Sequence, residues 1–317
     1  MHNFLIFTLP VYSETCFFDK KMKNSVFIVI LNWNGWKDTV ECVESCLKIT
    51  YSNFRILIVD NGSTDGSETI LKKRFPEAEI IQTGSNLGFA GGNNVGIKYA
   101  LEQGAEYIWL LNNDTIVDIN ALAGLVAELH KNPEAGIAAS KIYYFSKPKV
   151  IWFAGGTWNP VDHIARHNGL DEEDARQYDV VAETDFATGC SLLFKASLIS
   201  KIGYLKEDYY LYWEDVDWCV NARKNGWKII YVPNSHVWHK VSQSVENKSS
   251  AQNYYYFRGG LLFYSRNAPG FVLRFAATHF VYSLKQFLCG DKSIFLGYLP
   301  GLKDFVLKRF GKRVQHQ

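Results

Sequence analysis

The sequence VFIVILNWNG at residues 26–35 sets the pattern on which this chain is built. Its first six residues are apolar and rich in β-branched side chains, and a polar turn follows them at once. An unbroken apolar run of this length is typical of a strand that a parallel sheet buries on both faces. The pattern returns as RILIV before DNGSTDG at residues 55–66, and as YIWLL before NND at residues 107–114.

Helical segments separate these strands, and the links between them are short. We expect helices over 36–49, from an N-cap at Ser63 or Thr64 to 75, from the glycine-rich 86–96 to 103, and over 119–130, with another strand at 79–82. Four alternations of strand and helix predict an α/β fold with a doubly wound, mostly parallel sheet flanked by helices. Ligands of such sheets bind at the C-terminal ends of the strands, where the polar turns of this chain fall.

The pattern changes after Asn132. Strands are expected at 137–145, 150–153, 188–194 and 228–232, the last ending before Pro233, together with a helix at 212–225 and a charged surface loop at 163–181. From Gln252 the chain is helical and aromatic with interleaved basic residues. We therefore expect a catalytic domain at 23–245, a C-terminal helical extension at 246–317, and a disordered or non-native extension at 1–22, with Met22 as the natural start.

The length and the charge distribution of the chain limit the classes of function that it can have. The chain has 317 residues, 47% of them hydrophobic, which is enough for a large core. The net charge of +2 does not favour nucleic acid as a partner. From Arg258 to the end, however, ten Lys/Arg face two Asp/Glu, so this stretch carries +8 and the rest −6. An acidic body with a basic, aromatic tail indicates contact with an anionic surface at one end.

Cysteine usage and hydropathy indicate the compartment. The six cysteines are scattered and form no CxxC pair, which is typical of reduced thiols in a cytosolic protein. No run of eighteen apolar residues occurs, so the sequence predicts no transmembrane helix.

Two acidic turns follow strands of the expected sheet. Asp60 could accept hydrogen bonds from a nucleobase or a ribose, with Gly62 permitting close approach, or it could belong to an ordinary Asx turn. Asp114 is the one carboxylate of Asn112-Asn113-Asp114, so any contact with a divalent metal falls to it. An aspartate in this place is also a common turn residue.

A third acidic cluster lies in WEDVD at residues 213–217. Three carboxylates are costly to crowd among apolar neighbours unless they act on something. Asp215 could be a general base that takes a proton from an acceptor hydroxyl. Asp217 could pair with Arg223, and the alternative for the whole cluster is a solvated helix start.

Three weaker features complete the motifs. Histidines 236 and 239 follow Pro233, and one of them could bind a metal or a phosphate, although packed histidines are more common. The stretch GFAGGNN at 88–94 could wrap phosphates at a helix N-terminus. The stretch TGC at 188–190 could line an acceptor site or form a turn.

Taken together, the motifs resemble the family-2 inverting glycosyltransferases of the GT-A fold over residues 26–239. The matching pieces are VILNWNG, VDNGSTDGS, NLGFAGGNN, LLNNDT, TGCSLLF, and WEDVDWCVNARKNGWKI followed by VPNSHVWH. Each piece is weak alone, but their order and spacing are specific. The NLGFAGGNN form is most similar to the rhamnosyltransferase-like branch of cell-surface polysaccharide assembly.

This resemblance implies a role for each motif. Asp215 would be the base of the acidic pair Glu214-Asp215, and Asp114 and His239 would contact Mg²⁺ or Mn²⁺. The family's acidic triplet is incomplete here, because Asn112 and Asn113 replace its first two acids. The nucleotide and donor side would comprise Asn32, Asn34, Asp60, Asn61, Gly88, Asn93 and Asn113. The acceptor side would comprise Gly189 and Trp213.

The implied reaction is an in-line displacement at an anomeric carbon with inversion. The donor is a nucleoside-diphosphate sugar, with thymidine-diphosphate rhamnose as the first guess, and the acceptor is a glycan or lipid-linked saccharide. FVLRF at 271–275 and FVLKRF at 305–310 mix aromatic and basic residues as interfacial helices do. We therefore expect a cytoplasmic protein with peripheral membrane contact through its C-terminal region, or a helical cap packed on the sheet.

Three other classes of protein fit the sequence less well. A nucleotidyltransferase usually needs a basic, glycine-rich loop after the first strand, and this chain has no Lys or Arg there before Lys37. An NAD enzyme is disfavoured because the GxGxxG fingerprint is missing. A non-catalytic nucleotide-sugar or carbohydrate-binding protein would explain the aromatic residues but not the acids at the strand ends.

Overall fold

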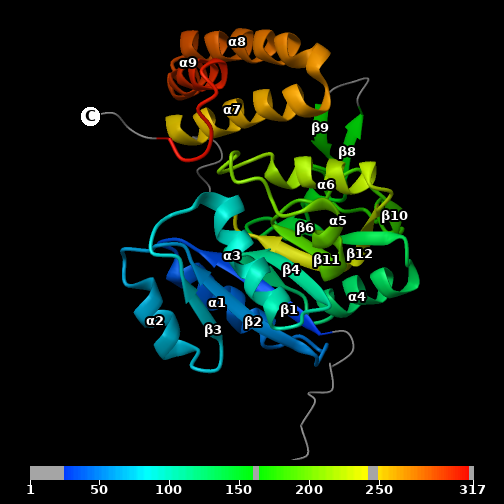
Figure 1. The fold of residues 1–317 in the computed structure, drawn as a ribbon. Helices are drawn as coiled ribbons and strands as arrows, with labels where there is room; N and C mark the ends of the chain where they lie inside the picture. The colour runs from blue at the N-terminus through cyan, green and yellow to red at the C-terminus, as the bar shows by residue number, and fades with distance from the viewer. Residues whose placement is uncertain (1–24, 160–163, 242–248, 314–317) are drawn as a thin grey trace, which may run out of the picture.

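A computed structural model describes residues 25–159, 164–241 and 249–313, so the predicted extension at 1–22 lies outside the described residues. One sheet runs in the order β10-β12-β6-β11-β4-β1-β2-β3, with β5 beside β12 and β7 beside β6 (Figure 1). Its strands are β1 (Val26–Asn32), β2 (Phe54–Asp60), β3 (Glu79–Gln82), β4 (Tyr107–Asn112), β5 (Thr115–Val117), β6 (Ala135–Tyr144), β7 (Ile151–Phe153), β10 (Ala182–Glu183), β11 (Ser191–Lys195) and β12 (Lys228–His239).

The half of the sheet formed by β3, β2, β1 and β4 is parallel, as predicted. β1, β4 and most of β2 are buried on both faces because helices cover them, whereas β3 at the edge of the sheet is partly exposed (Figure 1). The helices of this part are α1 (Trp36–Cys46), α2 (Ser67–Arg74), α3 (Gly88–Glu102) and α4 (Ala121–Lys131). The predicted α/β fold with a mostly parallel sheet is confirmed.

The predicted N-cap of α2 is wrong. The cap position is Gly66, with a left-handed φ of 83°, and neither Ser63 nor Thr64 caps the helix. Both residues are bonded elsewhere: the Ser63 hydroxyl donates to Asp60, and the Thr64 amide donates to Asn34. Ser63 and Thr64 therefore bond to residues at the ends of β1 and β2 and do not cap α2.

The other half of the sheet is mixed. β11 is antiparallel to both β4 and β6, while β12 is parallel to β6. The prediction that the last strand ends at Val232 is wrong, because β12 continues to His239. Its register against β6 shifts between Val232 and His236, and a β-bulge of this kind tolerates Pro233 within a strand. Beyond the shift, β12 also pairs with β5.

Shorter elements connect the sheet to the C-terminal helices. They are β8 (Gly156–Asn159) with β9 (Ile164–His167), 3₁₀ helices at Ala196–Leu198 and Pro269–Phe271, α5 (Ile199–Ile202) and α6 (Glu214–Lys224). The predicted surface loop at 163–181 contains β9, which pairs with β8 as a two-stranded antiparallel sheet. β9 has the sequence IARH, whose polar second half fits a surface loop as well as a strand.

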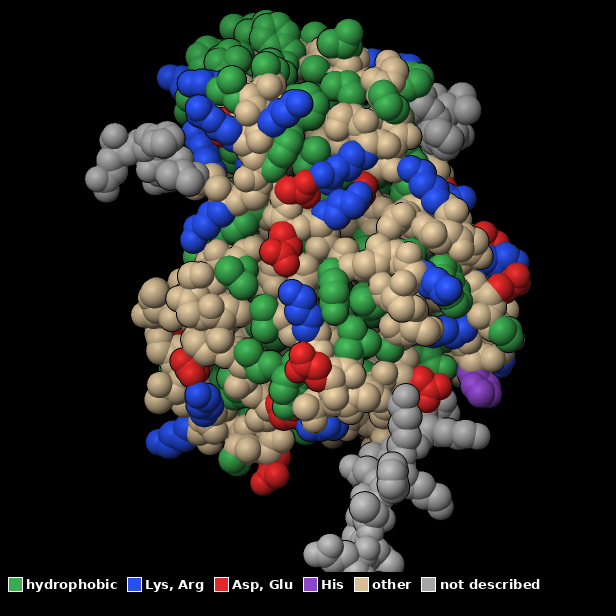
Figure 2. Space-filling model, viewed as in Figure 1, with side chains coloured by type: hydrophobic (Ala, Val, Ile, Leu, Met, Phe, Trp, Pro, Cys, Tyr) green, Lys and Arg blue, Asp and Glu red, His purple; other side chains and the backbone are tan. Residues whose placement is uncertain are grey.

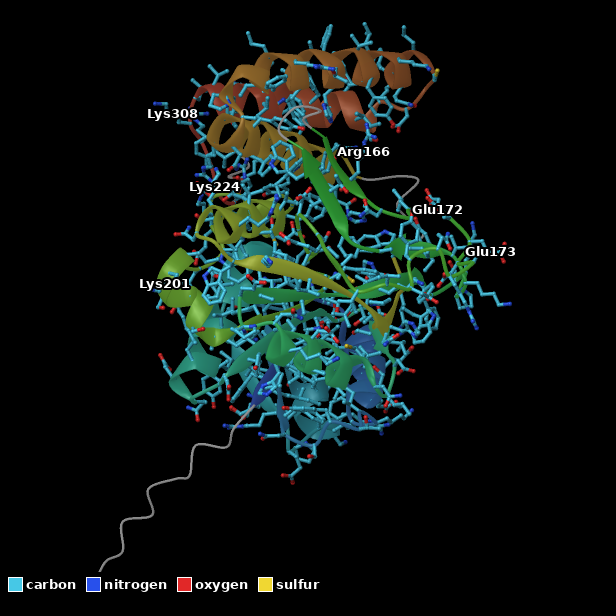
Figure 3. All side chains as sticks on the ribbon, turned by 90° about the vertical axis from the view of Figure 1, so that its right-hand side faces the viewer. Arg166, Glu172, Glu173, Lys201, Lys224 and Lys308 are labelled. Carbon is cyan, nitrogen blue, oxygen red and sulfur yellow. The ribbon has the colours of Figure 1, made fainter. Side chains whose placement is uncertain are left out.

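The C-terminal helices are α7 (Ser250–Asn267), α8 (Val272–Leu288) and α9 (Ser293–Val306). They stack at one end of the molecule, and α8 is the layer farthest from the sheet (Figures 1 and 3). Trp213 beside α6 stacks on Phe263 of α7 at 5.0 Å between ring centroids. Hydrophobic side chains gather on the outer surface at this end (Figure 2). Among the described residues, no helix is both long enough and apolar enough to cross a membrane.

Two helix glycines give a matched test of this packing. A Cβ at Gly96 in α3 would lie 2.4 Å from a methyl carbon of Val29, whereas a Cβ at Gly124 in α4 would have no neighbour closer than 3.8 Å. We expect Gly96→Ala to lower the free energy of unfolding by about 1–3 kcal/mol through overpacking. Gly124→Ala should raise it by about 0.5–1 kcal/mol, because alanine restricts the unfolded chain. Urea denaturation measures both, and a Gly96→Ala protein as stable as the parent would contradict the close approach of α3 to β1.

Candidate active site

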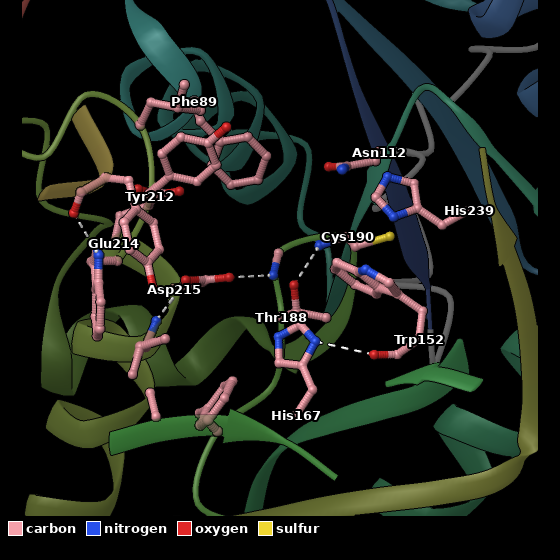
Figure 4. A pocket seen from close by; sticks show the side chains of 17 residues that line it. Phe89, Asn112, Trp152, His167, Thr188, Cys190, Tyr212, Glu214, Asp215 and His239 are labelled. Carbon is pink, nitrogen blue, oxygen red and sulfur yellow. Dashed lines mark hydrogen bonds between the residues drawn. The ribbon is translucent and has the colours of Figure 1, made fainter. Parts of the chain in front are cut away.

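A cavity of about 340 Å³ opens where β4 ends and β11 begins (Figure 4). Residues from α3, β4, β7, β9, β12, α6, α7 and the turn before β11 line it. In the view of Figure 4, Asp215 and Tyr212 lie on one side and His239, Cys190 and Trp152 on the other. Five predicted site residues line this cavity: Gly189, Trp213, Glu214, Asp215 and His239.

Asp215 has the environment of a general base. One carboxylate oxygen accepts a hydrogen bond of 2.8 Å from the amide of Gly189, and the other accepts one of 2.8 Å from the amide of Val216. Burial raises the pKa of Asp215, and these amide donors offset part of the rise. A carboxylate whose pKa is raised, and whose orientation two backbone amides fix, is suited to accept a proton from a bound hydroxyl.

Glu214 lies deeper than its neighbour. Burial, followed by the charge of Asp215, raises the pKa of Glu214 well above its usual value. Its Oε2 atom is buried and has no hydrogen-bond partner within the described part of the chain. An unsatisfied buried carboxyl oxygen is costly, and such costs concentrate at functional sites.

The predicted pair between Asp217 and Arg223 is wrong. Asp217 accepts from Lys206 at 2.9 Å and from the Asn267 amide at 2.7 Å, while Arg223 pairs with Asp185 at 2.8 Å. Residues six apart on a helix of 3.6 residues per turn point to different faces. Asp217 is therefore a buried structural carboxylate that joins α6 to α7.

The segment that delivers the acidic pair is strained. Tyr210, Tyr212 and Trp213 all have positive φ, at 68°, 69° and 75°. Each such residue costs roughly 1–3 kcal/mol and persists only where the surroundings impose it. The Phe89 amide donates to the Tyr210 carbonyl at 2.7 Å, and the Trp213 indole donates to the Tyr256 carbonyl at 2.9 Å.

Arg258 of α7 supports the same segment from behind. Its side chain is only 1% exposed. Its guanidinium donates to the carbonyls of Tyr209 at 3.2 Å, Gly311 at 2.7 Å and Asp208 at 3.4 Å, and to the Tyr254 hydroxyl at 3.0 Å. The C-terminal helices thereby support the segment that leads to the acidic pair Glu214-Asp215.

Asp114 and His239 face each other at 3.1 Å between Oδ1 and Nε2. Pairing of β12 with β5 sets His239 opposite Thr115, and the Lys240 amide donates to the Asp114 carbonyl at 2.8 Å. Burial alone would lower the pKa of His239, but contacts with Cys190 and Asp114 raise it to about 10. Burial alone would raise the pKa of Asp114. The hydrogen bond and the charge of His239 have the larger combined effect, so the pKa of Asp114 is lowered.

These two side chains fit a divalent metal that takes few protein ligands. In this structure His239 Nε2–H points at the Asp114 carboxylate, and once that proton is released both atoms are of types that bind Mg²⁺ or Mn²⁺. Among the residues that the structure describes, no group of three or more His, Cys, Asp or Glu could hold a metal. Phosphate oxygens of a ligand would have to complete the coordination.

The asparagines before Asp114 differ in position. Asn112 lines the cavity, and its amide donates to the Cys190 carbonyl at 3.0 Å. The Asn113 side chain instead donates to the Thr39 hydroxyl at 3.0 Å, away from the cavity lining. The backbone bond from Asn112 to Cys190 therefore joins the turn before β11 to the end of β4.

The predicted nucleotide residues form a separate polar cluster at the ends of β1 and β2. Asn32 and Asp60 are register partners, and the Asp60 carboxylate accepts from Asn32 at 2.6 Å, from Ser63 at 2.5 Å and from Gln82 at 2.6 Å. Asp60 is fully buried, so its oxygens organise this cluster in the present structure. Asn34 joins the cluster by accepting from the Thr64 amide at 2.8 Å.

Three further predicted residues hold the start of α3. The Asn61 side chain donates to the Gly88 carbonyl at 3.0 Å, and the Asn93 side chain donates to the Phe89 carbonyl at 3.0 Å. Gly88 has φ of 77°, and a Cβ there would lie 2.4 Å from the Tyr210 carbonyl oxygen. These residues position the glycine-rich turn against the strained segment and do not line the cavity.

Sequence reasoning missed several lining residues, among them Phe89, Trp152, His167 and Tyr256. His167 lies on β9 within the stretch predicted as surface loop. Its Nδ1–H donates to the Trp152 carbonyl at 3.1 Å, and burial lowers the pKa of His167 to about 4. Only the aromatic run at residues 254–257 offered a signal for Tyr256.

Comparison with known proteins identifies the family. The sequence profile of glycosyl transferase family 2 matches residues 25–203, more than half of the chain. The chain belongs to this family. The resemblance deduced from the motifs is thereby confirmed.

Its curated relatives include hexosyltransferases and rhamnosyltransferases. The low-salt glycan biosynthesis hexosyltransferase Agl10 of Haloferax volcanii is 27% identical over 223 residues, covering 68% of this chain and 66% of that protein. The N-acetylglucosaminyl-diphospho-decaprenol L-rhamnosyltransferase of Mycobacterium tuberculosis is 25% identical over 213 residues, covering 60% and 67%. The dTDP-rhamnosyl transferase RfbF of Shigella flexneri is 22% identical over 262 residues, covering 78% and 82%. The first two alignments span about two thirds of those proteins.

Solved structures support the same architecture. GalNAc-T7, solved with UDP, GalNAc and Mn²⁺, superposes with a TM-score of 0.59 at 14% identity, over 76% of this chain and 47% of that one. The mannosyltransferase PcManGT of Pyrobaculum calidifontis, solved with GDP-Man and Mn²⁺, gives 0.56 at 14% identity, over 90% and 86%. The predicted GT-A fold is confirmed.

The lowered pKa of His167 predicts a dependence of stability on pH. The folded-state pKa of about 4 lies below the usual 6.5, so the unfolded chain binds more protons between these values. Neutral His167 therefore contributes its full stability above about pH 6.5, and this stability is lost as the pH falls toward 4. His167→Gln should therefore flatten the fall in unfolding free energy between about pH 6.5 and 4, measured by urea denaturation. An NMR titration of His167 with a midpoint near its usual value would contradict this environment.

Proposed function

We propose that this family-2 glycosyltransferase transfers a sugar from a nucleoside-diphosphate sugar to a hydroxyl group, with inversion at the anomeric carbon. The observation that carries the proposal is the cavity itself. Asp215, a carboxylate of raised pKa, and His239, hydrogen-bonded to Asp114, both line it. A base and the histidine of a candidate diphosphate-binding pair on one cavity suit a single displacement between two bound substrates.

Asp215 is the general base of the proposed reaction. Its carboxylate takes the proton of the acceptor hydroxyl as that oxygen forms a bond to the anomeric carbon. The bond from this carbon to the diphosphate oxygen breaks on the opposite face, and the nucleoside diphosphate leaves with the bonding electrons. Gly189 and Val216 hold the carboxylate in place and burial raises its pKa, while the charge of Asp215 in turn helps to raise the pKa of the neighbouring Glu214.

Asp114 and His239 would hold the divalent metal, Mg²⁺ or Mn²⁺. When bound there, the ion would neutralise negative charge that develops on the departing diphosphate. Two relatives in fold were solved with Mn²⁺ and either a nucleotide or a nucleotide sugar, which supports this assignment.

The substrates follow from the relatives and from the polar cluster. Asn34, which is exposed at this cluster, would contact the nucleoside, and the buried Asn32 and Asp60 would hold the cluster in shape. Rhamnose carried on thymidine diphosphate is our proposed donor, because two relatives are named as rhamnosyltransferases. A glycan or lipid-linked saccharide is the proposed acceptor, since one relative's name specifies a decaprenol-linked acceptor. Such an acceptor would place the enzyme at the cytoplasmic face of a membrane, where its basic C-terminal region would meet lipid.

Replacing the base separates transfer from binding. We expect Asp215→Asn to lower the rate of sugar transfer by about 10²–10⁴, the usual contribution of a general base, while the affinity for the donor is retained. Mass spectrometry of glycosylated acceptor and released nucleoside diphosphate, over a panel of nucleotide sugars, measures the rate. Glu173→Gln makes the same chemical change at an exposed position outside the cavity and should leave the rate unchanged.

The non-catalytic alternative predicts a different result. A binding protein would bind the nucleotide sugar yet release no nucleoside diphosphate with any acceptor. An Asp215→Asn protein that transfers sugar as fast as the parent would remove Asp215 from the reaction.

A further inference from the structure

The outward face of α8 is apolar along its length. Leu273, Val281 and Leu288 are 82%, 66% and 76% exposed, and Phe280 and Leu284 between them are also exposed. Spacings of seven, eight, three and four residues place these side chains on one side of a helix. The opposite side carries Phe275 and Ser283, which are buried against the rest of the molecule.

The neighbouring helix extends this surface. Leu296, Leu299 and Val306 of α9 are exposed at helical spacing. The space-filling view shows hydrophobic side chains gathered over this end of the molecule, with basic side chains at the border below them (Figure 2). Soluble proteins rarely expose contiguous apolar surface of this kind unless something covers it. We call the exposed apolar residues of α8 and α9 the outer apolar face.

Charge around the outer apolar face is positive. Arg274, Lys285, Lys292, Lys303, Lys308 and Arg309 are all exposed on or beside α8 and α9. The two acidic residues of this region are engaged locally. Asp291 accepts from the amide and hydroxyl of Ser293, and Asp304 accepts from the Tyr254 hydroxyl at 2.7 Å.

We propose that the outer apolar face docks on an anionic lipid bilayer, with α8 lying in the plane of the interface. An amphipathic helix with an apolar side and basic flanks has the chemistry of interfacial membrane helices. Lipid phosphates would pair with the basic flanks while the acyl boundary receives Leu273, Val281 and Leu288. A second copy of this chain fits less well, because two such faces would bring like charges together.

The docking surface lies one helix layer from the active site. Phe275 of α8 stacks on Phe257 of α7 at 5.8 Å between ring centroids. The neighbouring residue Tyr256 lines both the catalytic cavity and a second cavity of about 450 Å³ beneath α8. Docking would hold the catalytic cavity close to the saccharide of a lipid-linked acceptor. This consequence rests on the proposed function, whereas the docking itself does not.

Co-sedimentation of the full chain with lipid vesicles tests the proposal without donor or acceptor. We expect the protein to bind vesicles that contain phosphatidylglycerol and to bind pure phosphatidylcholine weakly. Binding should weaken as salt rises from about 0.1 M to 0.5 M, because salt screens the basic flanks. The double variant Leu273→Glu/Val281→Glu should lower partitioning by about tenfold or more, since two apolar contacts become charged.

A matched control separates this face from surface hydrophobicity in general. Val180 is 76% exposed in a loop outside the C-terminal helices, so Val180→Glu should bind vesicles like the parent. Asp215→Asn should also bind like the parent, which keeps docking distinct from catalysis. Circular dichroism checks that each variant is folded.

Two results would overturn the proposal. One is a folded parent protein that fails to sediment with anionic vesicles. The other is equal loss of binding in the α8 double variant and in Val180→Glu. If the parent does not bind vesicles, and light scattering shows a dimer that dissociates in Leu273→Glu/Val281→Glu, the outer apolar face binds a second copy of the chain instead.

Discussion

The pairing of β12 with β5 holds the candidate site together. β12 begins as a parallel neighbour of β6, shifts register between Val232 and His236, and then runs antiparallel to β5. This path places His239 opposite Thr115 and brings its imidazole to Asp114. A strand that ended at Val232 would leave Asp114 as an ordinary turn residue. The register shift around Pro233 therefore allows His239 to reach Asp114, although the two residues belong to motifs far apart in the sequence.

A second constraint supports the opposite wall of the cavity. The segment before α6 contains three residues with positive φ, and it is held by the start of α3 on one side and by α7 on the other. Arg258, fully enclosed, donates to carbonyls of this segment and of the chain end near Gly311. The C-terminal helices are thus built into the site through backbone contacts, so the boundary proposed at residue 245 divides the sequence but not the packing.

Much of the fold was predictable because its signals are local. β1, β2 and β4 each contain an apolar run that ends in turn residues, so the positions of Asp60 and Asp114 at strand ends followed directly. The extension of β12 beyond Pro233 was not predictable, because it depends on pairing with residues far away in the sequence. The N-cap of α2 and the partner of Asp217 were wrong for a related reason. Hydrogen bonds from residues far away in the sequence, from Asn32 to the Ser63 hydroxyl and from Asn267 to Asp217, outweighed local preference.

In the candidate site, too, residues with local sequence signals were predicted and residues placed by long-range packing were not. Motifs with several polar residues at a strand or helix end led to Asp215, Gly189 and His239, which line one cavity. His167 and Tyr256 carried no such signal, because one lies on a four-residue strand and the other in a helical aromatic run. Their place at the cavity depends on how β9 and α7 pack over the sheet.

We propose that Asp114 and His239 form a metal-dependent site for the diphosphate of a nucleotide sugar. Isothermal titration of UDP, GDP and dTDP into the protein, with Mn²⁺ and with a chelator, tests this site. We expect one nucleoside diphosphate to bind in the presence of Mn²⁺, and Asp114→Ala to abolish the metal-dependent part of the affinity. Binding of equal strength with chelator, or in folded Asp114→Ala protein, would show that Asp114 and His239 hold no metal for the diphosphate.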